Sequence, residues 1–293
     1  LRLLWQSAGN ARRLARWGAR LSLRAMQGAV EGEAADHPGN RFARPLTQAR
    51  VFEGHFFPRE LFDRYVDMVE DATLTHAILA VCGEAARLYL ERHGELEEEP
   101  LQALLQVNVR NAGAHALVGN RIAINQVALY SDIIYPEGRL QAIVAANREL
   151  HSLEGAELTS IRLRSLYENL PAPLLAWLGR TANRRHSFNR RIMQGGSLGV
   201  AELHGPPEPL YLLVARLTGF TSISPLYSGC GLMFTASTYC DRLGLTFTSD
   251  RDMMPDPELM RECLDQAVEA LQSYLAAKKR RSRKPGRSPG RAA

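Results

Sequence analysis

One motif in the sequence could carry nucleophilic catalysis. Residues 195–199 read Gly-Gly-Ser-Leu-Gly, which matches the G-x-S-x-G pattern in which a strained strand-to-helix turn exposes the serine. Gly205-Pro206-Pro207 follows too soon to leave room for that helix, and no histidine lies downstream of His204, where the Ser, acid, His order requires one. We therefore interpret Ser197 as part of a glycine-rich loop, with a serine hydrolase as the weaker alternative.

Asp250 and Asp252 flank Arg251 in a D-x-D arrangement that could share one divalent cation. No other metal ligand clusters near them, and the pair falls at the end of an expected strand, just before a turn. Such residues form turn hydrogen bonds and salt bridges, so a structural role is favoured over a metal site. The cysteines form no C-x-x-C pair and no cluster at zinc spacing, which predicts reduced, mostly buried thiols and no metal: Cys82, Cys230, Cys240 and Cys263.

The eight histidines are scattered along the chain, and none is next to another. His76 has the clearest chemistry, because it should lie in the first turn of a helix capped by Thr73. The positive end of the helix dipole favours the neutral imidazole there, which is the form that acts as a base. A lone histidine is also commonly structural, so both roles stay open. No Walker loop or dinucleotide fingerprint is present.

Alternating strands and helices are expected to position these residues. The pattern predicts strands over 51–57, 101–110, 120–131, 210–217, 232–239 and 243–249, and helices that begin near 58, 73, 137, 171 and 257. The last helix has a continuous apolar face from Met260 to Leu275. Together these elements predict an α/β (α+β) fold in which helices flank a mixed β-sheet, without internal repeats.

The net charge of +5 is distributed unevenly. Residues 1–30 hold six arginines and residues 278–293 hold eight basic residues, and neither segment has an acid, so residues 31–277 carry a net charge of −9. An acidic body does not suggest specific nucleic-acid binding. The basic tail also lacks aromatic residues that could stack on bases.

The two basic ends are expected to differ in structure. Arg13, Arg16, Arg20 and Arg24 recur at helical spacing beside an apolar stripe, which predicts an amphipathic helix that lies on a membrane or packs on a partner or on the body. Residues 278–293 should form a disordered basic tail. We therefore divide the chain into a helix and loop over 1–44 that links domains, a folded domain over 45–277 and a tail over 278–293.

The composition, with 45% hydrophobic and 23% charged residues, is that of a globular domain with a sizeable core. Neither a secretory signal nor an apolar run of about 18 residues is present, which predicts a cytoplasmic protein. The first residue is Leu rather than Met, so the chain is expected to be processed or to be a piece of something longer.

A collinear set of short segments spans roughly residues 45–275. It runs through Ile78-Leu79-Ala80-Val81-Cys82, Arg87, Tyr89-Leu90, residues 107–110, Gly119-Asn120-Arg121, Gly205-Pro206, Pro209-Leu210-Tyr211-Leu212, Ala215-Arg216-Leu217, Ser224-Pro225-Leu226, Gly229, Tyr239, Arg242-Leu243, Asp250-Arg251-Asp252 and Pro255-Asp256. In this order and spacing the set resembles the C-terminal part of the bacterial wax ester synthase/acyl-CoA:diacylglycerol acyltransferases (WS/DGAT).

The resemblance implies a fold like that of CoA-dependent acyltransferases of the chloramphenicol acetyltransferase type, with two α/β domains around a channel and this chain as the C-terminal half. It implies an enzyme that esterifies a fatty alcohol or diacylglycerol with long-chain acyl-CoA, which is a substrate, so no cofactor is expected. The implied partners are an N-terminal acyltransferase domain or a second copy of the chain. The implied location is peripheral, on the inner membrane or on the surface of lipid inclusions.

The catalytic signature of the family, H-H-x-x-x-D-G, lies in its first domain and is absent from this sequence. The resemblance therefore assigns no catalytic residue here and implies that the chain alone is inactive. It marks as substrate-channel candidates Asn120, Glu202, His204, Gly205, Pro206, Ser224, Pro225 and Gly229. It marks as structural or channel residues Thr75, His76, Asp250 and Asp252.

Three loops depart from the family pattern. The Ser-Asn-Val-Pro-Gly-Pro loop reads Ala-Glu-Leu-His-Gly-Pro over residues 201–206, the Asn-Asp at a helix start reads Thr75-His76, and the Asp-Gly after Ser-Pro-Leu reads Ser228-Gly229. Glu202 thereby places a charge where the family has a neutral amide. These departures favour an alternative reading, a non-catalytic homologue that binds lipid or a partner protein.

Overall fold

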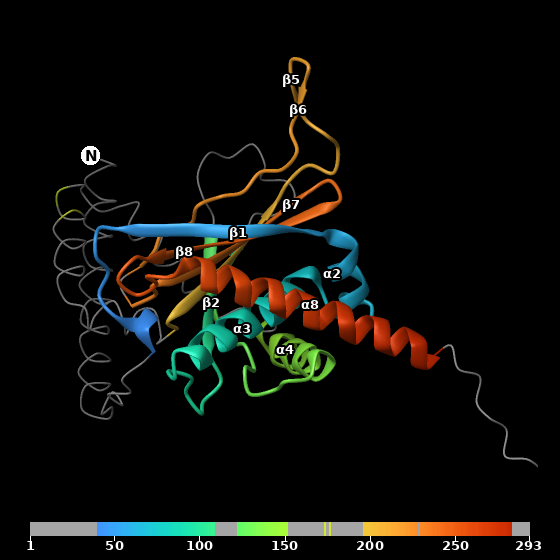
Figure 1. The fold of residues 1–293 in the computed structure, drawn as a ribbon, viewed down its shortest axis with the longest axis horizontal. Coiled ribbons are helices and arrows are strands. Elements are labelled where there is room, and N and C mark those ends of the chain that lie inside the picture. Colours follow the sequence, from blue (N-terminus) through green and yellow to red (C-terminus); the bar gives the residue numbers. More distant parts are fainter. Residues whose placement is uncertain are drawn as a thin grey trace, which may run out of the picture.

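The computed structural model describes residues 40–108, 122–151, 196–227 and 229–282, together with Pro173 and Ala176. Its centre is a six-stranded sheet in the order β1-β8-β7-β4-β2-β3 (Figure 1). The strands are β1 (Arg50–Pro58), β2 (Gln102–Asn108), β3 (Ile122–Ala128), β4 (Leu198–His204), β7 (Leu232–Tyr239) and β8 (Arg242–Asp250). β2, β4 and β7 run parallel, whereas the other neighbours pair antiparallel, so the expected mixed sheet is confirmed.

Helices gather on one side of this sheet (Figure 1). They are α2 (Arg59–Val66), α3 (Leu74–Arg92), α4 (Pro136–His151) and α8 (Pro257–Ser282). α3 and α8 pack against each other and against the sheet, and the apolar faces predicted for both helices are buried in the main core. Within the described part of the chain, none of the helices combines the length and hydropathy that crossing a membrane would need.

The two faces of the central strands differ in chemistry. Every residue of β7 is buried, and Leu232, Phe234 and Ala236 belong to the core that the helices cover. Side chains alternate along a strand, so the residues between them point to the opposite face. There Thr235 lies beside Thr246 of β8. The helix-facing side is therefore apolar, and the opposite side is rich in hydroxyl groups.

Only part of the expected glycine-rich loop is a loop: Ser197 lies directly before β4, whereas Leu198 and Gly199 are the first residues of that strand, which lies between β7 and β2. Glycine is uncommon inside strands unless another group approaches closely. A Cβ on Gly199 would lie 2.6 Å from the Met233 side chain, so close packing explains this glycine. The prediction failed because a small residue needed for packing resembles a loop residue in the sequence.

A single strand over residues 210–217 is also wrong. The segment forms the hairpin of β5 (Tyr211–Leu212) and β6 (Ala215–Arg216), which projects from the sheet (Figure 1). Leu213 in its turn has a φ of 55°, a conformation that glycine or asparagine usually supplies and that costs a bulky residue about 1–2 kcal/mol. The turn has no residue type that would reveal it.

The folded domain extends past both expected boundaries. Phe42, in the short 3-10 helix η1 (Arg41–Ala43), is fully buried, so residues 40–44 pack on the core instead of forming a linker. α8 continues through residues 278–282, where a disordered tail was expected, and Lys278 Nζ binds Glu137 at 2.9 Å. Residues 1–39, 283–293 and the helix expected from 171, apart from Pro173 and Ala176, lie outside the described residues.

Candidate functional site

Three of the expected site residues meet at one edge of the sheet. Because β2, β4 and β7 are parallel, their carboxyl ends lie at the same edge, which is where open α/β sheets bind ligands. Glu202, near the end of β4, shares the helix-facing side with Val200. It meets the first turn of α3, where Thr75 Oγ1 donates a hydrogen bond of 2.6 Å to Glu202 Oε2.

His204 completes this group, which we call the edge cluster (Thr75, Glu202 and His204). His204 Nε2 lies 3.1 Å from Glu202 Oε1. The histidine side chain is 73% exposed, whereas the glutamate side chain is 7% exposed. The ring is not aligned for a hydrogen bond, so Oε1 accepts none from the described residues. A buried carboxylate therefore lies next to an exposed imidazole.

The start of α3 explains why a carboxylate can be buried at this edge. No acidic side chain of α3 lies in its first turn. Glu202 instead supplies the negative charge that the positive end of the helix dipole attracts.

The sequence marked the three residues of the edge cluster one by one. The i, i+2 spacing of Glu202 and His204 becomes informative only once residues 198–204 are known to form a strand, because residues two apart in a strand share a face.

His76 serves the same helix terminus. Thr73 N donates to His76 Nδ1 at 3.1 Å, and His76 N donates to Thr73 Oγ1 at 3.4 Å. The two residues thus form a reciprocal capping box. His76 is buried, and its ring stabilises the turn that presents Thr75 to Glu202.

Gly205 and Pro206 tie the end of β4 to the end of β7. Gly205 N donates to Thr238 O at 2.9 Å, and Cys240 N donates to Pro206 O at 3.3 Å. A Cβ on Gly205 would lie 2.2 Å from Thr238 O, so a larger residue would push the strand ends apart. This pair fixes the position of the residue before it, His204.

The candidates Ser224, Pro225 and Gly229 lie apart from the edge cluster. Ser224 Oγ is 2.9 Å from Thr235 Oγ1, on the hydroxyl-rich face of the sheet. Pro225 is exposed. Gly229 has a φ of 91°, which glycine accepts readily, and precedes the start of β7 at the opposite end from Thr238. The sequence grouped residues that the fold divides between two faces.

Asp250 holds the chain around it together. Its side chain is fully buried and accepts hydrogen bonds from Thr47 N at 2.6 Å, Arg50 Nη1 at 2.9 Å and Asp252 N at 3.0 Å. Burial alone would raise the pKa of Asp250, but these hydrogen bonds outweigh burial and lower the pKa. Among the described residues no group of three or more histidine, cysteine or acidic side chains could hold a metal, and Asp252 is exposed in a turn.

Ser197 does not form a nucleophile elbow, because β4 follows it where a helix would be needed. Its buried hydroxyl accepts a hydrogen bond of 2.9 Å from Asn40 Nδ2. The four cysteines are unpaired, and burial raises the pKa of the Cys263 thiol to about 11. Asn120 lies outside the described residues.

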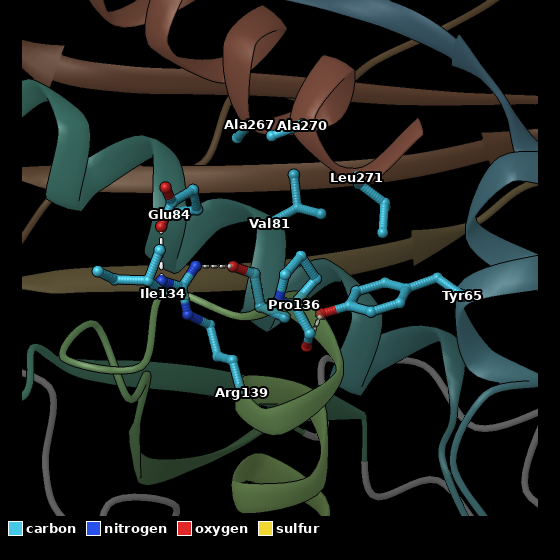
Figure 2. Close-up of a pocket in the computed structure, with 10 residues that line it drawn as sticks. Tyr65, Val81, Glu84, Ile134, Pro136, Arg139, Ala267, Ala270 and Leu271 are labelled. Carbon is cyan, nitrogen blue, oxygen red and sulfur yellow. Dashed lines mark hydrogen bonds and ion pairs between the residues drawn. The ribbon is translucent and has the colours of Figure 1, made fainter. Parts of the chain in front are cut away.

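A small cavity lies between the helices, lined by Tyr65, Glu84 and Arg139 among others (Figure 2). Its volume of about 30 Å³ is enough for one water molecule, so an acyl chain does not fit. Arg139 is buried and contacts Glu84, as Figure 2 shows, and Arg87 Nη2 lies 2.8 Å from Glu84 Oε1. Burial would raise the pKa of Glu84, but the hydrogen bonds from both arginines outweigh burial and lower the pKa. These charges pair with one another within the fold.

The β5–β6 hairpin presents aliphatic side chains to solvent. Leu212, Leu213 and Val214 are 80%, 93% and 98% exposed, and the hairpin stands away from the sheet and the helices (Figure 1). Clusters of exposed aliphatic side chains commonly mark interaction surfaces. The hairpin is therefore a candidate contact surface, and it begins seven residues after His204 in the sequence.

Comparisons with known proteins identify the family. The family model described as the WS/DGAT C-terminal domain matches residues 118–272, which is more than half of the chain. A Mycobacterium tuberculosis protein whose name gives diacylglycerol O-acyltransferase as its expected activity is 30% identical over 213 residues, which cover 73% of this chain and 44% of that protein. The O-acyltransferase WSD of Acinetobacter baylyi is 25% identical over 252 residues, covering 84% and 52%.

Solved structures agree on the fold. The wax ester synthase/diacylglycerol acyltransferase of Marinobacter aquaeolei VT8 matches with a TM-score of 0.60 at 20% identity, covering 89% of this chain and 57% of that chain. The nonribosomal peptide synthetase FmoA3 matches with a TM-score of 0.51 at 15% identity, covering 85% and 25%. The expected acyltransferase-type fold is confirmed, and the chain spans about half the length of the curated relatives it matches. The chain therefore belongs to the WS/DGAT family, through the C-terminal domain of that family.

Proposed function

We propose that this chain acts as the C-terminal half of an O-acyltransferase that transfers a long-chain acyl group from acyl-CoA to a fatty alcohol or a diacylglycerol. The match of residues 118–272 to the family domain carries this proposal. The names of the relatives, which refer to wax ester and diacylglycerol acyltransferases, suggest the two classes of acyl acceptor. Acyl-CoA would be consumed as a substrate, and no cofactor is invoked.

The proposed partner is an N-terminal acyltransferase domain, with a second copy of this chain as the alternative. The chain spans about half of its curated relatives, and its sequence lacks the paired-histidine signature. The exposed aliphatic hairpin supports a partner, since such a surface is stabilised when it is covered. We place the complex in the cytoplasm and peripherally on the inner membrane or lipid inclusions, where the acceptor lipids reside.

The test is a two-component assay. The purified chain is incubated with palmitoyl-CoA and either 1-hexadecanol or dioleoylglycerol, with and without the separately produced N-terminal half of the Mycobacterium tuberculosis relative. Alcohol-dependent release of the CoA thiol and formation of the ester are measured. Ester formation with both halves present is the expected result, and no CoA release with any alcohol in either arrangement would contradict the proposal.

A non-catalytic homologue that binds lipid or a partner protein is the second candidate. The observation that favours it is the presence of Glu202 and His204 at the end of β4, in the segment where the family pattern has Asn and Pro. Under this alternative, the chain binds fatty alcohol or dimerises through the β5–β6 hairpin without any ester being formed. Light scattering of the purified chain and of a variant with Leu212 and Leu213 changed to serine distinguishes dimerisation through the hairpin from dimerisation elsewhere.

A further inference from the structure

α8 ends in a strongly basic segment. From Ala270 to its last residue the helix holds no acidic residue, and residues 278–281 read Lys-Lys-Arg-Arg. Residues 278–280 are exposed, and the last turns of the helix run past α4 and the sheet (Figure 1). Four more basic residues and no acid follow in the sequence over residues 283–293. This end of the molecule is therefore positive and attracts anions, in contrast to the acidic body of the chain.

The start of α4 is fixed beside this basic end. Tyr274 Oη and Lys278 Nζ, one turn apart on α8, each donate a hydrogen bond of 2.9 Å to Glu137 Oε2. These hydrogen bonds, from Lys278 and from Tyr274, lower the pKa of Glu137, so the carboxylate that holds the two elements together stays ionised at neutral pH. Tyr65 Oη donates to Pro136 O at 2.6 Å and holds the first residue of α4.

Two large apolar side chains are exposed at this junction. Ile134 and Tyr135, directly before α4, are 71% and 74% exposed. Arg139 N donates to Tyr135 O at 3.0 Å, which fixes the backbone of the tyrosine. Ile134 lies at the small cavity that Ala270 and Leu271 of α8 also line (Figure 2). Adjacent exposed apolar side chains that the fold holds in place commonly mark a contact surface.

The combination of apolar and basic side chains indicates which anionic partner fits. Tyrosine is favoured at the boundary between lipid and water, because its ring is apolar and its hydroxyl group polar. An isoleucine is stabilised when acyl chains cover it. Lysine and arginine can bury their aliphatic stems while their charges stay among phosphate groups. A nucleic acid would supply phosphates without apolar cover for the isoleucine, so the set fits the surface of an anionic membrane better.

We propose that Ile134, Tyr135 and the basic end of α8 form a surface that docks on an anionic lipid membrane. The isoleucine and the tyrosine enter the headgroup region, and Lys279 and Arg280 contact lipid phosphates. The proposal deepens the peripheral location within the proposed function, on which it rests, and it requires no acyl transfer. The β5–β6 hairpin projects elsewhere (Figure 1), so a partner protein can cover the hairpin while this surface lies on lipid.

The charged part is tested by sedimentation of the chain with phosphatidylcholine vesicles that contain or lack phosphatidylglycerol. Binding should require phosphatidylglycerol and be lost at about 1 M salt, where the Debye length is about 3 Å. Lys279→Gln combined with Arg280→Gln should weaken binding by roughly 25-fold, since each basic residue near an anionic surface contributes about fivefold. The matched control, Arg44→Gln combined with Arg251→Gln, removes two exposed arginines near the start of α8 and should bind as the wild type does.

The apolar part is tested separately. Ile134→Ser combined with Tyr135→Ser should weaken binding to the anionic vesicles by about 10-fold or more, while the dependence of binding on salt stays unchanged. The control is Leu212→Ser combined with Leu213→Ser, which changes the exposed side chains of the hairpin and should bind as the wild type does. Wild-type binding by the first variant, with the circular dichroism spectrum of the wild type, would overturn the proposal. An equal loss in the hairpin variant would do the same.

Two further results would contradict an anionic membrane as the partner. One is equal binding to vesicles with and without phosphatidylglycerol, and the other is tighter binding of a single-stranded oligonucleotide than of the anionic vesicles at the same salt concentration. The vesicle assay contains no acyl-CoA and no N-terminal half. A chain that binds anionic vesicles but forms no ester therefore refutes only the proposed acyl transfer, whereas ester formation without vesicle binding refutes only the docking surface.

Discussion

Two largely buried carboxylates, one within α3 and one next to its first turn, have partners of different kinds. Glu84 lies in the middle of the helix and binds two arginines, Arg87 and Arg139. Glu202 belongs to β4 and lies beside the start of the helix. It accepts a hydrogen bond from the Thr75 hydroxyl group and lies near the ring of one histidine, His204. Both side chains are largely buried, at 16% and 7% exposure. Glu84 is held by two guanidinium groups, whereas Glu202 accepts a hydrogen bond from one hydroxyl group and lies 3.1 Å from an exposed ring.

The two carboxylates differ in how much it costs to change their partners. A buried charge that keeps permanent partners stabilises one arrangement, and removal of a partner is costly. A buried charge with a neutral donor and an exposed ring can accept a new partner at small cost. Stability should therefore depend more on the group around Glu84 than on the edge cluster.

The largest effect is expected at Arg139. Arg139→Met removes one permanent partner of Glu84 inside the fold and should lower the free energy of unfolding by about 3–5 kcal/mol. Urea denaturation followed by circular dichroism measures it. The control is Arg64→Met, since Arg64 is half-exposed and lies 3.7 Å from the exposed Glu60, and its cost should stay below about 0.5 kcal/mol. Equal costs for the two variants would show that burial does not distinguish these ion pairs.

Glu84→Gln should cost about 2–3 kcal/mol at neutral pH, because the arginines lose a charged acceptor. The variant should also change how stability depends on pH. The pKa of Glu84 is lowered in the folded protein, so its contribution is complete above the unfolded value of about 4.3 and is lost as the pH falls through the folded pKa. Denaturation curves between pH 6 and pH 3 should thus converge for wild type and variant, and parallel curves would contradict the assignment.

Thr75→Val retains the shape of the side chain but removes the donor to Glu202 Oε2. The variant should lose about 1–2 kcal/mol, since one buried oxygen is left without its hydrogen bond. Thr75→Ser keeps the donor and is the matched control, which should lie within a few tenths of a kcal/mol of wild type. Thermal unfolding of both variants side by side gives the comparison, and equal losses would mean that packing of the Thr75 methyl group matters more than the hydrogen bond.

The smallest effect on stability is expected at Glu202. Glu202→Gln keeps the bond from Thr75 and loses only the charge, so the change in unfolding free energy should stay below about 1 kcal/mol. The same urea titration used for Arg139→Met measures it. A loss as large as that of Arg139→Met would make Glu202 a structural charge like Glu84 and would remove the contrast between the two carboxylates.

Local sequence patterns predicted the helices and strands whose apolar residues recur at regular spacing. β7, β8, α3 and α8 were predicted with almost correct bounds, because their apolar repeats and caps are strong. β4 was missed because Gly199 fits against Met233, a packing demand that no local pattern contains. The hairpin turn was missed because Leu213 occupies a conformation that its residue type disfavours.

The candidate site was foreseen as separate residues and not as a cluster. The family resemblance marked Thr75, Glu202 and His204 individually. The hydrogen bond between Thr75 and Glu202 joins positions 127 residues apart, so it depends on the order of strands in the sheet. The same order carries Ser224 and Gly229 away from the edge cluster, which sequence proximity to Gly205 could not indicate.

The pairing of β1 with β8 constrains how the protein can be made in the cell. Arg50 pairs with Asp250, so the first strand of the sheet meets its neighbour only after the intervening 200 residues have been synthesised. A ribosome that adds about 5–20 residues per second needs roughly 10–40 s for that length. During this interval β1 leaves the ribosome without its partner strand, and a nascent chain that stalls before β8 would offer that unpaired strand to chaperones and proteases.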